Sequence, residues 1–172
     1  MKKNKIINTL FIIGLGFYIL FVLWNIPFKY VSPLELASTD RFFSRTLNLI
    51  PFNDVINGNF NKFDIFGNII LFIPLGIYLP IIIKNLKASK FIFIVVLISF
   101  IFESSQYIFG IGASDITDII TNTIGGILGI CIYKIIKLIL KKDSNIKNFI
   151  TICSTMVMLP VSVMIVGLFI AN

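Results

Sequence analysis

The residues in this sequence that could do chemistry are carboxylates and carboxamides set within strongly apolar stretches. Such side chains are costly to bury in apolar surroundings, and they usually face a partner, a water-filled cavity or a ligand. A spacing of three or four residues puts several of them on common helix faces, as with Glu103 and Gln106. The candidate ligand-binding residues are Asp64, Asn68, Glu103, Gln106, Asp115, Asp118 and Asn122.

These side chains suit four kinds of site. The simplest is a hydrogen-bond cluster that holds helices together. A pocket for a polar headgroup or peptide-like ligand is the second, because carboxylates and carboxamides bind amines, hydroxyls and amides, with Arg41 and Arg45 nearby for phosphate. An intramembrane enzyme is the third, with Glu103 and Asp118 as general acid and base. A transporter ranks last, since the sequence shows no inverted repeat.

The composition indicates the kind of protein that must position this cluster. Hydrophobic residues make up 57% of the 172 residues and charged residues 13%. Five apolar segments are long enough to cross a bilayer, which needs about 20 helical residues. We therefore expect an all-α, polytopic membrane protein with one domain, whose partner is the lipid bilayer. The predicted spans are Ile6–Trp24, Asp64–Ile83, Phe91–Phe109, Ile116–Tyr133 and Phe149–Ile170.

The distribution of positive charge predicts the orientation of these spans. If they alternate across the membrane, eleven of the fifteen lysines and arginines fall on one side. Cytoplasmic loops carry this excess, so the N-terminus is predicted to be cytoplasmic. The basic charge is therefore a sign of topology, and we expect no nucleic-acid partner. Because the chain has no histidine and no thiol cluster, we expect neither a metal site nor a cofactor.

The outer segment between the first two spans contains a helix-start signal. Ser32 is the predicted N-cap, Pro33 the first helical residue, and Glu35 lies three residues after the cap. The expected helix runs from Pro33 to Asn48 and lies along the membrane surface. Further along the chain, Gly110 to Gly112 is a predicted turn between the third and fourth spans.

The depth of the polar residues predicts that they form one site. At about 1.5 Å per residue, Glu103 and Asn122 lie roughly 9 Å, and Asn68 roughly 6 Å, from the outer ends of their spans. A second layer lies about one turn nearer the outer side and holds Asp64, Gln106 and Asp118. Below them the fourth span has a Gly-x-x-x-Gly seam, Gly125 to Gly129, which lets a neighbouring helix approach closely.

Four ordered motifs resemble those of the VanZ-like family. They are Asn48-Leu49-Ile50-Pro51-Phe52; Asn68-Ile69-Ile70-Leu71-Phe72-Ile73-Pro74-Leu75-Gly76; Glu103 with Gln106; and Ser114-Asp115-Ile116-Thr117-Asp118 leading to Asn122-Thr123-Ile124-Gly125-Gly126. The resemblance covers residues 48–133, about half of the chain. Many members of the family have an arginine shortly before the Asp-x-x-Asp pair, where this chain has Gly112-Ala113. If that arginine pairs with the carboxylates or with a ligand phosphate, this protein must use Arg41, Arg45 or neither.

The resemblance implies a protein of the bacterial plasma membrane, in a Gram-positive cell envelope. The family is named for a membrane protein that raises resistance to the glycopeptide teicoplanin. The leading hypothesis is therefore that the protein binds an envelope component, such as a lipid-linked cell-wall intermediate, or a lipoglycopeptide at the outer leaflet, and so lowers glycopeptide susceptibility. The alternative is an intramembrane enzyme acting on a lipid-linked substrate.

Overall fold

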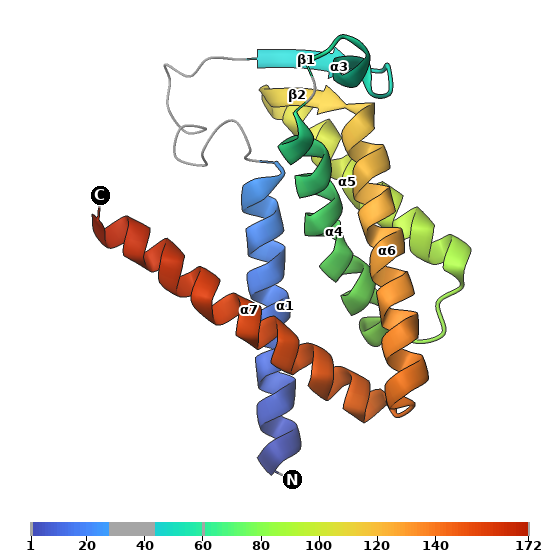
Figure 1. Cartoon of the computed structure of the whole chain (residues 1–172), viewed down its shortest axis with the longest axis vertical. Coiled ribbons are helices and arrows are strands. Elements are labelled where there is room, and N and C mark those ends of the chain that lie inside the picture. Colours follow the sequence, from blue (N-terminus) through green and yellow to red (C-terminus); the bar gives the residue numbers. More distant parts are fainter. Residues whose placement is uncertain (1, 28–43, 60, 172) are drawn as a thin grey trace. The chain divides into compact units, whose positions relative to one another are not determined.

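Five long helices account for most of the chain in the computed structural model, which describes residues 2–27, 44–59 and 61–171. All five are long and apolar enough to cross a membrane. A short helix, α3 (Asn53–Ile56), and two strands, β1 (Ser44–Asn48) and β2 (Ile111–Asp115), complete the described elements (Figure 1). The long helices are α1 (Lys2–Asn25), α4 (Lys62–Ile82), α5 (Ala88–Phe109), α6 (Ile116–Leu140) and α7 (Asp143–Ala171).

The helices agree with the predicted spans at most of their ends. The largest differences are at the α6–α7 junction, where α6 continues to Leu140 and α7 already begins at Asp143. Hydropathy ends a span where lysines begin, but the backbone can stay helical because lysine side chains reach away from the apolar region. The protein is thus mostly helical, with five candidate spans, and the small sheet is an addition to the expected all-α class.

The predicted surface helix is wrong over its last five residues, which form β1. Residues 28–43, including the predicted cap, lie outside the described residues. Strand β1 pairs in parallel with β2, with Ser44 opposite Ile111 and Asn48 opposite Asp115. The pairing partner is distant in sequence, so the local helix-start signal carried no information about it. The predicted turn is also shorter than expected: Gly110, with φ 59°, ends α5, and Ile111 is already in β2.

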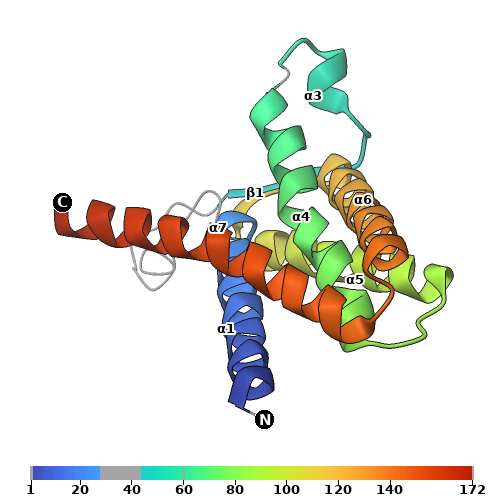
Figure 2. The same cartoon turned by 60° about the horizontal axis from the view of Figure 1, so that its bottom comes forward.

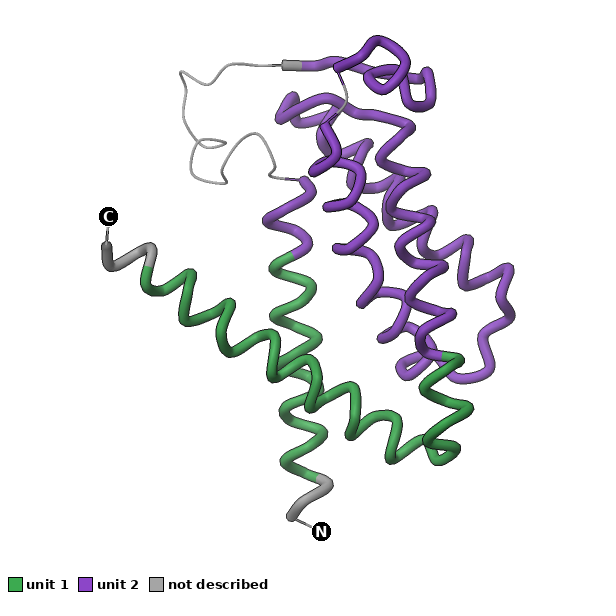
Figure 3. Tube along the Cα trace, in the orientation of Figure 1, with its two compact units in different colours: residues 1–21, 134–172 green, residues 22–133 purple. Residues whose placement is uncertain are grey.

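The chain divides into two compact units, residues 1–21 with 134–172 and residues 22–133 (Figure 3). In the second unit, α4, α5 and α6 lie side by side in two views (Figures 1 and 2). A methyl group added at Gly125 or Gly129 would collide with the carbonyls of Ile69 and Ile73 on α4. The Gly-x-x-x-Gly prediction is thereby confirmed, with α4 as the neighbouring helix.

The first unit joins α1 to α7 through Lys147. The Lys147 Nζ donates to Asn8 Oδ1 at 2.8 Å and lies 4.7 Å from the centroid of the Phe11 ring. Ile150 and Thr151 are buried on the same part of α7. This unit holds none of the candidate site residues, all of which belong to residues 22–133.

Candidate functional site

The site is built around Asp115, the last residue of β2 and the residue before α6. Its Oδ1 accepts a hydrogen bond from the Thr117 backbone N–H at 2.7 Å, as an N-cap carboxylate does. Its Oδ2 accepts from Asn48 Nδ2 at 3.0 Å. The Asp115 backbone N–H donates to Glu103 Oε2 at 2.9 Å. One residue therefore connects β1, the start of α6 and the buried carboxylate of α5.

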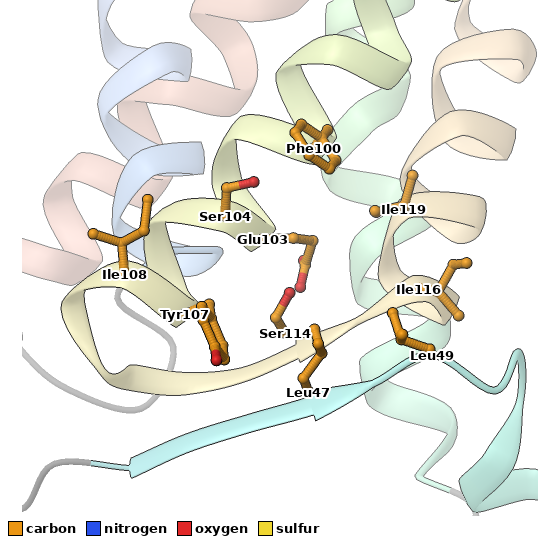
Figure 4. Close-up of a pocket in the computed structure, with 10 residues that line it drawn as sticks. All are labelled: Leu47, Leu49, Phe100, Glu103, Ser104, Tyr107, Ile108, Ser114, Ile116 and Ile119. Atoms are coloured by element: carbon orange, nitrogen blue, oxygen red, sulfur yellow. The ribbon is translucent and has the colours of Figure 1, made fainter.

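Glu103 is almost completely enclosed by the protein, with 2% of its surface exposed. It follows Ser99 on α5 by one helical turn. Its carboxylate points toward Ser114 of β2 (Figure 4). The helix fixes the backbone of Glu103, and the hydrogen bond from Asp115 fixes one carboxylate oxygen. The carboxylate is thus held at the junction of a helix and a strand.

A pocket of about 570 Å³ opens beside this carboxylate. Its walls come from β1 and the residues after it, from α5, from β2 and from the first turn of α6 (Figure 4). Most lining side chains are apolar, and the polar ones are few, which is the usual composition of a small-molecule site. The lining residues are Leu47, Leu49, Phe100, Glu103, Ser104, Tyr107, Ile108, Ser114, Ile116 and Ile119.

A second group of polar side chains lies between the helices. Asn122 of α6 donates from Nδ2 to Ser99 Oγ on α5 at 2.9 Å, and both residues are fully buried. Asn68 of α4 is also buried. Within the described residues, Asn68 Nδ2 and Asn122 Oδ1 have no hydrogen-bond partner. These carboxamides are in the position expected for contacts between helices in the apolar region.

Gln106 connects α5 to the end of the first helix. Its Nε2 donates to the Ile26 backbone carbonyl at 2.8 Å, and 2% of its surface is exposed. A carbonyl just beyond a helix end has no partner within that helix, so the Gln106 amide satisfies it. This contact fixes the C-terminal part of α5, one turn after Glu103.

The structure therefore separates the seven candidate residues by position. Glu103 and Asp115 are in direct contact, and Glu103 lines the pocket. The buried carboxamides Asn68, Gln106 and Asn122 lie between helices, and Asp64 and Asp118 are half-buried; none of these five is in the pocket lining.

Several pocket residues were not singled out from the sequence. Leu47 and Leu49 come from β1 and the turn after it, while Tyr107 and Ser114 flank the turn between α5 and β2. The sequence feature that could have indicated them is the motif around Asn48. The family resemblance includes this motif but assigns no role to it. In the structure Asn48 binds Asp115, and the Phe52 backbone N–H donates to Thr117 Oγ1 at 2.9 Å. The motif thus attaches the β1 segment to the start of α6.

Arg45 lies beside Gly112-Ala113, the position at which the family resemblance would place an arginine that this chain lacks. In the strand register Arg45 is opposite Gly112. Its Nη2 donates to the Ile108 backbone carbonyl at 3.1 Å, and Ile108 lines the pocket. Arg41 lies outside the described residues. Of the two arginines, Arg45 is the one that the structure places beside the site.

The comparisons with known proteins agree with the motifs of this site. The VanZ/LLP1 family model matches residues 15–137, which include α4, α5, most of α6 and both strands. The chain is 42% identical over 120 residues to "Protein VanZ" of Enterococcus faecium, covering 69% of this chain and 70% of that protein. No solved structure matches the chain. With five helices able to span a bilayer and this match over most of its length, the protein is an integral membrane protein that belongs to the VanZ/LLP1 family.

Proposed function

We propose that the protein binds an envelope component or a lipoglycopeptide in the pocket beside Glu103, and thereby lowers susceptibility to glycopeptide antibiotics. The observation that carries the proposal is a buried carboxylate on the wall of an otherwise apolar pocket. A carboxylate retained in apolar surroundings within a membrane protein usually has a functional reason. The 42% identity to Protein VanZ supports the same direction.

The size and position of the pocket suit an amphiphilic ligand. Its volume of about 570 Å³ is within the range of roughly 300–1,000 Å³ that is common for small-molecule sites. With the N-terminus in the cytoplasm, as the lysines predict, the turn between α5 and β2 is at the outer side. The pocket would then take up its ligand from the outer leaflet, where glycopeptides and cell-wall intermediates are found.

The proposal is tested by teicoplanin susceptibility in a sensitive Gram-positive host. The wild-type chain is expected to raise the inhibitory concentration. Ile119→Phe, which fills the pocket, is expected to remove this effect. Ile124→Phe is the matched control, because it makes the same substitution on α6 at an exposed position outside the lining. Membrane levels of all chains are matched by immunoblot.

The results separate binding from the other kinds of site. Loss of protection in Ile119→Phe but not in Ile124→Phe supports the pocket, while equal protection by both variants would show that the pocket has no part in it. A general acid–base pair would lose activity in both Glu103→Gln and Asp118→Asn, so full activity of either variant excludes the enzyme. A wild-type chain that gives no protection contradicts the proposal.

A further inference from the structure

The surface that the pocket presents to a ligand is almost wholly apolar. Glu103 and Ser114 belong to the lining, but they are only 2% and 8% exposed. The lining residues with the largest exposed fractions are all apolar: Leu49 at 65%, Ile108 at 63% and Phe100 at 56%. The carboxylate is thus enclosed in the wall, where a backbone N–H of β2 donates to it. The interior of the pocket therefore suits an apolar group.

The apolar side chains come from three elements and extend along α5. Phe100 and Tyr107 are seven residues apart on this helix, or two turns, which is about 10 Å along its axis. Ile119 of α6 and Leu47 of β1 lie on two other sides of the same pocket (Figure 4). A linear apolar chain can contact all three elements at once.

The lipid bilayer is a source of such chains. Most of the lining residues belong to α5 and α6, which are both able to cross a membrane. Phe100 and Ile108 are exposed on α5, so a lipid chain beside this helix can enter the pocket without crossing water. The chain gains little hydrophobic free energy by this transfer, because the bilayer is as apolar as the pocket. A preference for one lipid must then come from its headgroup.

Arg45 is placed to recognise a headgroup beside the pocket. It is exposed, and it lies on the same face of β1 as Leu47, a lining residue two positions further on. Its Nη2 donates to the carbonyl of Ile108, another lining residue. A guanidinium has five N–H donors and binds phosphate through paired hydrogen bonds. Strand β2 joins the end of α5 to the start of α6, so the sheet lies at one end of these spans, the level of lipid phosphates.

We propose that the pocket holds the apolar chain of a bilayer lipid whose anionic phosphate headgroup binds Arg45 outside the pocket. The chain packs against Phe100, Ile116 and Ile119. The proposal rests on the pocket being the binding site of the proposed function, and it adds the chemical class of the ligand. It also assigns a role to Arg45, which lies beside the pocket but is not part of its lining.

The test uses a photoreactive alkyl phosphate. The full-length protein in dodecyl maltoside micelles is irradiated with dodecyl phosphate that carries a diazirine at the end of its chain, and labelled residues are mapped by peptide mass spectrometry. Labelling of Phe100 and Ile119 is expected to saturate as the probe concentration rises. The detergent supplies the same chain in large excess, so saturation requires recognition of the phosphate.

Phe93 is the internal control for this labelling, because it is exposed on the same helix outside the lining. Its labelling should rise in proportion to the probe concentration, as expected of a side chain in contact with bulk detergent. Labelling of Phe100 that rises in the same way, without saturation, would overturn the proposal.

Competitors without a diazirine separate the chain from the headgroup. Dodecyl phosphate is expected to displace the probe at a concentration about tenfold lower than dodecanol, because the alcohol lacks the charge-assisted hydrogen bonds. Dodecylamine should compete no better than dodecanol. Butyl phosphate keeps the headgroup but lacks most of the chain, so it should leave the probe bound. Equal competition by dodecyl phosphate and dodecanol would contradict the role of the headgroup, and equal competition by butyl phosphate would contradict the role of the chain.

Variants of Arg45 locate the headgroup. In Arg45→Gln the half-saturating probe concentration is expected to rise about tenfold, since the charge is lost. Arg45→Lys keeps the charge and should stay close to the wild type, whereas a merely structural role of the guanidinium would be lost in both variants. Lys62→Gln is the matched control, because it removes one exposed positive charge from the same predicted side of the membrane. Equal half-saturation in Arg45→Gln and Lys62→Gln would overturn the assignment of Arg45.

The pocket-filling variant links this test to the susceptibility assay and keeps their outcomes separate. Ile119→Phe should remove the saturable labelling of Phe100, and Ile124→Phe should retain it. Protection that depends on Ile119 without any preference for phosphate would overturn this inference alone. Saturable, phosphate-dependent labelling in a protein that gives no protection would overturn the proposed function alone.

Discussion

At the scale of single residues, substitution of Asp115 should disturb contacts with several elements at once. It is half-buried, and three of its hydrogen bonds go to three different elements, β1, α5 and α6. The backbone N–H would still reach Glu103 after a side-chain substitution, but both carboxylate contacts would change. The cap of α6 and the attachment of β1 therefore depend on one side chain. Different substitutions of Asp115 distinguish the contributions of these two contacts to stability.

We expect Asp115→Ala to lower the free energy of unfolding by about 1–2 kcal/mol through the lost cap alone, with a further loss from β1. Asp115→Asn keeps an oxygen for the Thr117 N–H but turns an amide toward Asn48, so it should cost less. Thermal unfolding of the purified protein in detergent measures both. Asp54→Ala, at an exposed position on α3, is the control. Equal stability of Asp115→Ala and the control would show that the cap does not contribute to the free energy of unfolding.

At the scale of elements, hydropathy and residue spacing predicted the structural features that depend on residues close in sequence. The five helices and the glycine seam follow from runs of apolar residues and from Gly125 and Gly129, which are four residues apart. The sheet could not be predicted, because Asn48 and Asp115 are brought together over a long stretch of chain that includes three helices, α3, α4 and α5. For the site, the cost of burying a carboxylate singled out Glu103, but the pocket walls depend on that same long-range pairing.

The glycine seam predicts a sharp difference between two similar substitutions. Gly129→Ala would push a methyl group into the Ile73 carbonyl of α4, so the helices must separate, at a cost of about 1–3 kcal/mol. Gly67→Ala meets nothing within 4 Å and should be neutral or slightly stabilising, since alanine favours a helix. Detergent-solubilised melting temperatures compare the two. Equal melting temperatures for the Gly129→Ala and Gly67→Ala proteins would contradict the close α4–α6 contact.

The β1–β2 pairing is open to a direct chemical test. Thr46 and Ala113 are opposite each other in the register, which suits a disulfide with Cα atoms about 4.4–6.8 Å apart. In a chain with Cys131 and Cys153 replaced by serine, the pair Thr46→Cys and Ala113→Cys should cross-link under mild oxidation, detected by a mobility shift that reductant reverses. The pair Thr46→Cys and Gly58→Cys, which does not share a strand register, should stay reduced. Failure of the first pair would contradict the sheet.

At the scale of the whole molecule, the charge pattern predicts how the protein lies in the bilayer. Eleven of the fifteen basic residues fall on the predicted cytoplasmic side, together with both chain segments that join α4 to α5 and α6 to α7. The short helix α3 and the two strands then belong to the outer side. This arrangement is a prediction from the sequence, and the proposed uptake from the outer leaflet depends on it.

Cysteine labelling in intact cells tests this orientation. In the cysteine-free background, Asn57→Cys should react with a membrane-impermeant maleimide because Asn57 is exposed on the predicted outer side. Lys87→Cys, exposed between α4 and α5, should react only after the cells are permeabilised. Each variant is the control for the other. The reverse pattern would place the pocket on the cytoplasmic side and remove the basis for uptake from the outer leaflet.

The long-range pairing of β1 with β2 also sets an order of events during synthesis. Asn48 and Asp115 are separated by 67 residues. At about 5–20 residues per second, β1 leaves the ribosome roughly 3–13 s before its partner strand. During that interval α4 and α5 are already available for insertion, but Glu103 has neither the Asp115 N–H nor the β1 wall beside it. A chain released before Ile111 would contain the carboxylate and no pocket, so the pocket is completed only in the last third of translation.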